Sequence, residues 1–335
     1  MGYDRMSLRR IGIFLVGAAF LLAAGGCALQ HAAAQQRLAR GDAALAQDDL
    51  DVALAEFQEA VRLDPQLAEG HRKLGEAYKK AGKLEQAADS LETAVALDPR
   101  DAIAMFDLGE VYRLLNRMAQ AIRAYAATCA LEPQNFEPRF RLATAYHETG
   151  EIEQAIIEYK QALKLRPRDA QAWSNLGAAY DALGREYEAI HAYKQSLECD
   201  TGQPVVLVNL ATVYIHQERF GPARRVLETA IKQDPKLSVA HERLGYCNWR
   251  DQRYAEALQN YRKAIELDDQ NASAHAGLGV VLMTQYLTKP ALTDCRDDAI
   301  EAWHRSLEID PDQPRLRALV EKYRVRPRQP LLTAD

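Results

Sequence analysis

The sequence lacks an excess of either charge. It has 42 Lys and Arg residues against 47 Asp and Glu residues, which gives a formal net charge of −5 over 335 residues. A broad nucleic-acid-binding surface normally needs a strong basic excess, so we expect no nucleic-acid partner. Glycine and proline are also scarce, at 18 and 13 residues, which excludes a collagen-like or disordered chain.

Catalytic and metal-binding motifs are absent too. The sequence contains no HExxH, no GxSxG, no P-loop and no GxGxxG followed by a strand pattern. Its five cysteines form no CxxC pair and no His/Cys cluster, so zinc is not expected. We interpret Cys129, Cys199, Cys247 and Cys295 as free thiols, while an oxidising compartment leaves a disulfide open. The sequence therefore predicts a protein that is not an enzyme and takes no cofactor, metal or small-molecule substrate.

Long apolar runs are missing except near the N-terminus. Arg5, Arg9 and Arg10 precede an apolar run from Ile11 to Ala24, and small residues follow it. This order of basic, apolar and small-residue segments is typical of a secretory signal. The run is shorter than the roughly 20 residues that a membrane-spanning helix prefers. We therefore expect the rest of the chain to be exported.

A fixed period of 34 residues is the strongest positive signal. Prolines mark it at Pro65, Pro99, Pro133, Pro167 and Pro235, with Thr201 and Asp269 at the two grid points that lack proline. Leu-Gly or Leu-Ala pairs keep the same phase and begin at Leu74, Leu108, Leu142, Leu176, Leu210, Leu244 and Leu278. Tyrosines follow at Tyr78, Tyr112, Tyr146, Tyr180 and Tyr214. Marked residues three or four apart share one face of a helix, so each period predicts two amphipathic helices.

This pattern resembles the tetratricopeptide repeat (TPR) family over residues 34–313. Small residues such as Gly75 and Ala87 would let the two helices approach closely, and each proline would end a second helix. One hairpin cannot bury its apolar face, so neighbouring hairpins must stack. The resemblance implies an all-α fold, a right-handed α-solenoid of eight TPR helix-turn-helix repeats with a C-terminal capping helix.

The period also predicts the organisation of the chain. We expect a lipoprotein-type signal peptide at 1–26, a short tether at 27–33, a capping helix at 314–324 and a flexible basic tail at 325–335. The eight repeats are expected at 34–67, 68–101, 102–135, 136–169, 170–203, 204–237, 238–271 and 272–313. In the last repeat Pro311 takes the place of a proline expected at 303, eight positions earlier. We expect this insertion, near 287–297, to lengthen the turn between two helices.

The segment from Leu22 to Cys27 resembles a bacterial lipoprotein cleavage box, with Gly25 and Gly26 before the cysteine. That resemblance implies lipidation of Cys27. Ala28 rather than Asp after it favours the outer membrane, facing the periplasm. Two alternatives stay open, namely signal cleavage in the alanine run at 32–34 and an uncleaved N-terminal anchor.

The partner-binding residues are inferred from the same family. In TPR proteins the residue before the conserved Leu points into a groove lined by the first helices. Asn175 and Asn209 resemble part of the asparagine ladder of O-GlcNAc transferases, and such amides pair with peptide backbone. Trp249 beside Tyr246 is a typical interface anchor. We expect a groove formed by Lys73, Arg141, Asn175, Asn209, Arg243, Tyr246 and Trp249. Arg72, Lys79 and Lys80 near Lys73 suggest an acidic partner segment.

These features together predict a non-enzymatic protein–protein interaction scaffold. The hypothesis is a membrane-anchored TPR lipoprotein that binds a peptide or protein segment in its groove during cell-envelope assembly. One alternative is an adaptor or regulatory subunit of an envelope hydrolase or glycosyltransferase. Another is a cytosolic TPR co-chaperone.

Overall fold

Helices follow one another in pairs along the chain. The computed structural model describes residues 28–323, and in this range it shows a helix at 28–46, then α2 to α17, and no strand. The helices that open a pair after the first are α3 (Ala68–Lys80), α5 (Ala102–Leu114), α7 (Phe136–Glu148), α9 (Ala170–Ala182), α11 (Pro204–His216), α13 (Ser238–Arg250) and α15 (Ala272–Thr288). Their partners are α4 (Leu84–Leu97), α6 (Met118–Leu131), α8 (Ile152–Leu165), α10 (Glu186–Cys199), α12 (Phe220–Gln233), α14 (Tyr254–Leu267) and α16 (Thr293–Ile309). α2 (Leu50–Leu63) pairs with the helix at 28–46, and α17 (Pro314–Tyr323) follows the last pair. The all-α prediction is confirmed.

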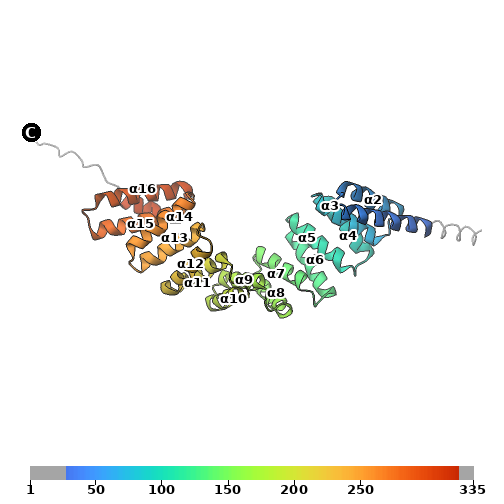
Figure 1. The fold of residues 1–335 in the computed structure, drawn as a ribbon, viewed down its shortest axis with the longest axis horizontal. Helices are drawn as coiled ribbons and strands as arrows, with labels where there is room; N and C mark the ends of the chain where they lie inside the picture. Colours follow the sequence, from blue (N-terminus) through green and yellow to red (C-terminus); the bar gives the residue numbers. More distant parts are fainter. Residues whose placement is uncertain (1–27, 324–335) are drawn as a thin grey trace, which may run out of the picture. The chain divides into compact units, whose positions relative to one another are not determined.

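The helices divide between two compact units. The first unit, Met1–Leu165, contains the helix at 28–46 and α2 to α8, and the second, Arg166–Asp335, contains α9 to α17. Within each unit neighbouring helices pack together, as α3 does with α4 and α13 with α14 (Figure 1). The signal segment, Cys27 and the basic tail lie outside the described residues. None of the helices between residues 28 and 323 combines the length and apolarity needed to cross a membrane.

Glycine at the crossing of two paired helices is required by the close approach of the helices. A Cβ added at Gly75 would lie 2.6 Å from Cγ of Leu91, and one added at Gly109 would lie 2.7 Å from Cε1 of Tyr125. Real Cβ atoms are not found at such distances, so a larger residue would push the helices apart. The sequence-based assignment of these positions to helix crossings is therefore confirmed.

An aspartate, rather than the proline, marks the end of most second helices. The side chains of Asp64, Asp98, Asp200, Asp234, Asp268 and Asp310 each accept a hydrogen bond from the backbone N–H two residues later. Such Asx turns compete with continuation of a helix. They explain why α10 and α14 end in phase with the other second helices although Thr201 and Asp269 replace proline.

The inserted residues of the eighth repeat lengthen its helices. α15 and α16 each have 17 residues, whereas α13 has 13 and α14 has 14. The connection at 289–292 has four residues, against three at 251–253. The predicted lengthening of the turn amounts to one residue, because four of the eight extra residues continue α15 and three extend α16. An apolar stretch through Leu287 has no residue that would break α15 earlier.

α17 covers the last pair of helices. Leu316 and Val320 are buried, and Tyr323 lies against Trp303 with ring centroids 6.3 Å apart. Trp303 is 1% exposed and belongs to the core. Without α17 this apolar face of α16 would meet solvent, so α17 acts as the cap that a stack of hairpins needs at its end.

Candidate protein-binding surfaces on the first helices

First helices of successive pairs contact one another directly in each unit. In the first unit Lys73 on α3 pairs with Asp42 at 2.9 Å, and Lys79 on α3 pairs with Asp107 on α5. In the second unit the indole Nε1 of Trp249 on α13 donates to Oγ1 of Thr284 on α15 at 3.4 Å. These contacts join the first helices of neighbouring repeats within each unit.

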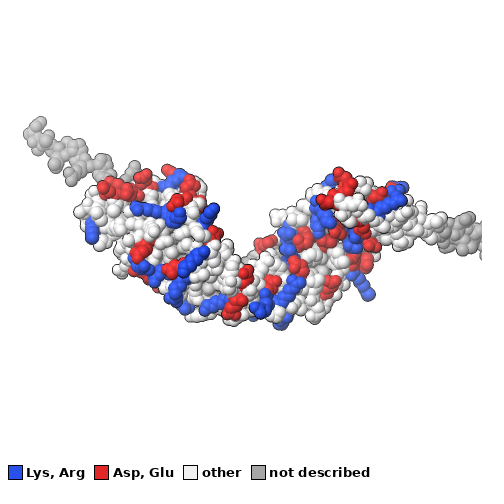
Figure 2. Space-filling view, in the orientation of Figure 1, with Lys and Arg blue, Asp and Glu red and all other residues white. Residues whose placement is uncertain are grey.

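The surface of the first unit carries charges that are already paired. Arg141 reaches Glu137 at 3.0 Å and Glu110 at 3.5 Å. Arg72 pairs with Asp101 at 3.2 Å, and Lys80 lies 3.6 Å from Glu76. Figure 2 accordingly shows basic and acidic side chains intermixed over this unit. Every basic residue expected to receive an acidic segment therefore has its own carboxylate.

Glu110 is the centre of one of these networks. Burial raises the pKa of Glu110, but hydrogen bonds from Tyr125 and Arg113 and the charge of Arg141 outweigh it, so the pKa lies below its usual value. The carboxylate is thus held in its charged form at neutral pH and binds Arg141 in place. A partner that needs Arg141 must compete with this carboxylate.

The corresponding surface of the second unit is different. Asn175 and Asn209 are half-buried, and neither amide has a hydrogen-bond partner among residues 166–323. Nε of Arg243 is buried and also has no acceptor within that range. Two exposed valines, Val205 at 60% and Val239 at 41%, occupy the first turns of α11 and α13. This surface therefore offers unpaired amides beside apolar side chains, which suits an extended polypeptide.

An aromatic cluster continues this surface. The ring of Tyr246 lies 5.9 Å from Trp249 and 6.1 Å from Phe220, measured between centroids. The guanidinium of Arg250 lies 4.4 Å from the Phe220 centroid and donates a 2.9 Å hydrogen bond to the Tyr246 hydroxyl. Glu218 holds the same guanidinium at 3.1 Å. We call Phe220, Tyr246, Trp249 and Arg250 the repeat 7 aromatic cluster.

Sequence reasoning brought Tyr246 and Trp249 together and missed Phe220. Phe220 begins α12, in the preceding repeat, at a phase where Leu84 and Tyr254 also occur. It therefore looks like an ordinary packing residue. The missing signal was the stacking of Arg250 over its ring, which depends on contact between α12 and α13.

The histidines that recur in one repeat position have a structural role. The Nε2 atoms of His71 and His241 lie 3.1 and 3.3 Å from the carbonyl oxygens of Pro65 and Pro235, so each Nε2 carries the proton and donates. Trp173 makes the same bond to Pro167 at 2.9 Å. Within residues 28–323 no three His, Cys, Asp or Glu side chains are gathered as metal ligands would be.

Comparison with known families agrees with this architecture. A family model described as the cilia and flagella-associated protein 70 C-terminal domain matches residues 103–278, which is more than half of the chain. A model described as TPR repeat matches residues 41–82 and 77–116. The chain therefore belongs to this family of TPR domains, and it is a TPR protein–protein interaction scaffold. Scaffolds of this kind are generally non-catalytic, and they bind protein or peptide partners.

Solved structures share the fold at low sequence identity. The C-terminal part of a TPR protein from Cytophaga hutchinsonii is 17% identical, with a TM-score of 0.63, and the match covers 72% of this chain and 99% of that one. A TPR protein from Parabacteroides merdae is 17% identical, with a TM-score of 0.56 and coverage of 76% and 98%. Pseudomonas aeruginosa pilF is 19% identical, with a TM-score of 0.51 and coverage of 62% and 94%. The search of curated proteins gives no match.

Proposed function

We propose that this scaffold is exported and captures an extended protein segment on the first helices of its second unit. The observation that carries the proposal is the contrast between the two surfaces. Asn175 and Asn209 have no hydrogen-bond partner among residues 166–323, whereas Lys73 and Arg141 in the first unit are paired. The two amides are half-buried, so a docked segment can replace water as their hydrogen-bond partner.

The chemistry of the surface defines the segment. Asparagine amides donate and accept, so Asn175 and Asn209 can bond both polar groups of a peptide backbone in extended conformation. The repeat 7 aromatic cluster adds a large apolar contact with a cation at its edge, of the kind found at the centres of interfaces. The segment is therefore expected to carry an aromatic or aliphatic side chain that reaches Trp249.

The proposal includes attachment to the bacterial envelope through Cys27. The sequence from Leu22 to Cys27 supports it through its resemblance to a lipoprotein box. Such a lipid would hold the repeats close to the membrane, facing the periplasm from the outer membrane, and the captured segment would belong to a cell-envelope assembly. Metabolic labelling with a radioactive fatty acid in a bacterial host tests this part. Label that is incorporated by the full chain and lost in Cys27→Ser supports it, and equal label in both chains refutes it.

A peptide-display selection tests the binding surface. The affinity of peptides selected on the full chain is then compared between this chain and a variant with Asn175→Ala, Asn209→Ala, Arg243→Ala and Trp249→Ala. Because single interface anchors contribute about 2 kcal/mol or more, we expect affinity to fall by well over tenfold.

A matched variant in the first unit provides the control. Lys73→Ala with Arg141→Ala also removes long side chains from first helices, but it acts on charges that are already paired. We expect this variant to bind the selected peptides as the original chain does. Equal loss in both variants, or loss only in the first-unit variant, would exclude the second unit as the capture surface. Far-ultraviolet circular dichroism establishes that both variants are folded.

A further inference from the structure

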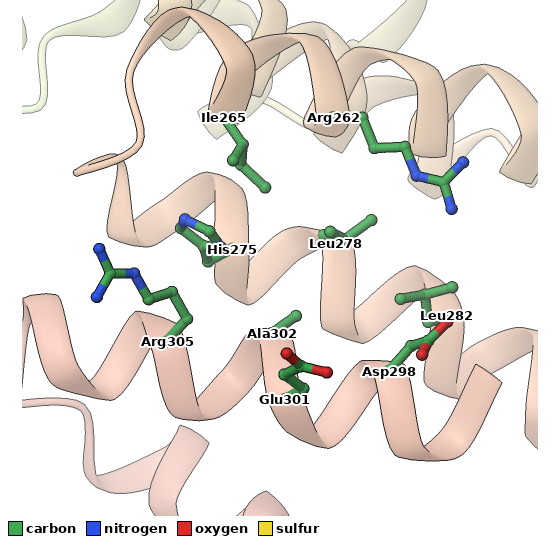
Figure 3. Close-up of a pocket in the computed structure, with 9 residues that line it drawn as sticks. All are labelled: Arg262, Ile265, His275, Leu278, Leu282, Asp298, Glu301, Ala302 and Arg305. Carbon is green, nitrogen blue, oxygen red and sulfur yellow. The ribbon is translucent and has the colours of Figure 1, made fainter. Parts of the chain in front are cut away.

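A surface cavity in the eighth repeat lies on three helices of the second unit. It opens between α14 and α16, has α15 as its floor, and measures about 400 Å³ (Figure 3). Ile265, Leu278 and Leu282 give it apolar walls, and the polar side chains of Arg262 and Asp298 stand at one end. Its volume falls within the range of roughly 300–1,000 Å³ that is usual for ligand pockets.

The cavity arises where the repeat pattern omits a tyrosine. The second to sixth repeats carry a tyrosine four residues after the conserved Leu, at Tyr78, Tyr112, Tyr146, Tyr180 and Tyr214. Thirty-four-residue steps bring this position to Asn248 in the seventh repeat and to Leu282 in the eighth. Leu282 is buried and lines the cavity, but its side chain lacks the ring and hydroxyl of the other repeats.

The third repeat shows what such a tyrosine does. The Tyr112 hydroxyl donates a 2.7 Å hydrogen bond to Glu92 of the preceding second helix, and Gln120 of the following helix acts on the same hydroxyl by lowering its pKa. In the second repeat Gln58 donates to the Tyr78 hydroxyl at 2.8 Å in the same way. The hydroxyl therefore bonds to the preceding second helix in both repeats, and in the third repeat a polar side chain of the following second helix also acts on it.

The eighth repeat keeps polar groups at the positions of Glu92 and Gln120. Arg262 follows Glu92 by five periods of 34 residues, so it occupies the same repeat position. Asp298 corresponds in the same way to Gln120 when the eight inserted residues are added. Leu282 lies between these two side chains in Figure 3. Both are exposed, and neither forms an ion pair with any residue from 28 to 323. The eighth repeat thus has polar side chains at both positions but no tyrosine between them.

We propose that this cavity binds a tyrosine side chain of a partner protein. The ring packs on Leu278, Leu282 and Ile265, and its hydroxyl accepts from Arg262 and donates to Asp298. An aliphatic side chain or a phenylalanine would fill the apolar part but leave both charged groups without the hydrogen bonds that a hydroxyl supplies. The site is formed by α14, α15 and α16 and does not depend on the proposed capture surface of α9, α11 and α13.

Small phenols test the proposal on the full chain with methyl-labelled Leu and Ile residues. We expect p-cresol, the tyrosine side chain itself, to shift the methyl signals of Ile265, Leu278 and Leu282, with half-saturation on the order of 1 mM. Toluene lacks the hydroxyl, and we expect it to bind about tenfold more weakly. N-acetyl-tyrosinamide is expected to bind as well as p-cresol, because the mouth of the cavity must admit a polypeptide backbone.

Two substitutions on one helix separate filling of the cavity from a general effect. Leu282→Tyr places a ring inside the cavity and should abolish p-cresol binding. Leu287→Tyr makes the same change on α15 at a side chain that is 55% exposed and outside the lining, and it should bind normally. If Leu282→Tyr does not fold, Arg262→Ala serves instead, since it should weaken p-cresol to the level of toluene and leave toluene unchanged.

Four results would overturn the proposal. They are the absence of p-cresol shifts at these methyl groups, equal affinity for toluene and p-cresol, failure of N-acetyl-tyrosinamide to bind where p-cresol does, and undiminished p-cresol binding by folded Leu282→Tyr. Equal affinity for toluene would indicate a non-specific apolar cavity, and failure of the amide would indicate a site for free small phenols. Each result leaves the peptide selection on Asn175, Asn209 and Trp249 unaffected, so the two proposals fail independently.

Discussion

Gln252 lies in a strained turn that glycine should relieve. The turn between the two helices of a repeat has one residue with positive φ at a fixed phase, and this residue is Gly82, Gly150 or Gly184 in three repeats. In the seventh repeat the position is Gln252, with φ of 61°. A residue with a Cβ pays about 1–2 kcal/mol for this conformation. Glycine avoids that cost but loses roughly 0.5–1 kcal/mol of backbone entropy on folding.

The expected gain from Gln252→Gly is therefore about 0.7 kcal/mol. Since a factor of ten corresponds to about 1.4 kcal/mol, the local opening of this hairpin should become about threefold rarer. Repeat arrays open locally, so amide hydrogen exchange is the appropriate measurement. Slower exchange is expected in α13 and α14, where opening of the turn exposes backbone groups.

A reciprocal substitution makes the reasoning testable in both directions. Gly184→Gln introduces the same side chain at φ of 67°, with no neighbouring atom within 4 Å of the added Cβ, so its effect is conformational. We expect exchange in α9 and α10 to become faster by a similar factor. Faster exchange in Gln252→Gly, or no change in both variants, would refute the assignment of strain to this turn position.

Four further predictions concern packing and burial. Tyr159 and Ala155 are both fully buried, so Tyr159→Ala should cost about 3–5 kcal/mol through a cavity, and Ala155→Leu about 1–3 kcal/mol through overpacking, in thermal melts. Burial raises the pKa of Cys247 to about 12, so its thiol should resist alkylation at pH 8 until the protein unfolds. Above about pH 9 the thiol of the unfolded chain loses its proton while the folded one keeps it, so the free energy of unfolding should fall towards pH 12. Burial also raises the pKa of Glu242 despite the nearby Arg243, so the folded state favours the neutral carboxyl. The stability that the neutral form contributes is complete below the pKa of Glu242 in the unfolded chain, and it is lost as the pH rises through the folded-state pKa. Glu242→Gln should therefore raise the urea midpoint at pH 7 more than at pH 4.

The repeat phase predicted the helix pairs because each marked residue has a local role. Gly75 and Gly109 face the ring or branched side chain of the partner helix, and spacing along the helix alone identifies such positions. The end of each second helix was also predicted. The repeat pattern attributes it to proline, but Asp200 and Asp268 form the same turn where no proline follows. Local sequence patterns thus located the paired helices but assigned the end of the second helices to the wrong residue.

The insertion in the eighth repeat shows where the repeat phase stops being informative. An insertion breaks the register, and the period cannot say whether extra residues extend a loop or a helix. Residues near Leu287 continue α15 because they are compatible with a helix and the C-terminal part of the stack covers their buried face. A propensity reading of that segment, made without reference to the period, would have favoured longer helices.

The repeat phase assigns Lys73 and Arg141 to first helices, but it does not predict whether their charges are paired. Their pairing with Asp42 and Glu110 joins residues 31 positions apart, on different repeats, and side-chain length and rotamer decide it. A sequence pattern gives the position of such a side chain on its helix, but only the packed neighbours show whether its charge is free to bind a partner.

This difference in availability explains why the two units should recognise different chemistry. A partner carboxylate that docks on Lys73 or Arg141 must displace an existing carboxylate, so it gains little net electrostatic energy and must still be desolvated. A backbone segment that docks on Asn175 and Asn209 displaces only water and satisfies groups that have no partner within residues 166–323. The same argument applies to Trp249, whose ring already lies beside Tyr246 and loses little conformational freedom on binding. Recognition by this scaffold should therefore depend weakly on salt, in contrast to a surface of unpaired basic residues, whose affinity falls steeply as ions screen it.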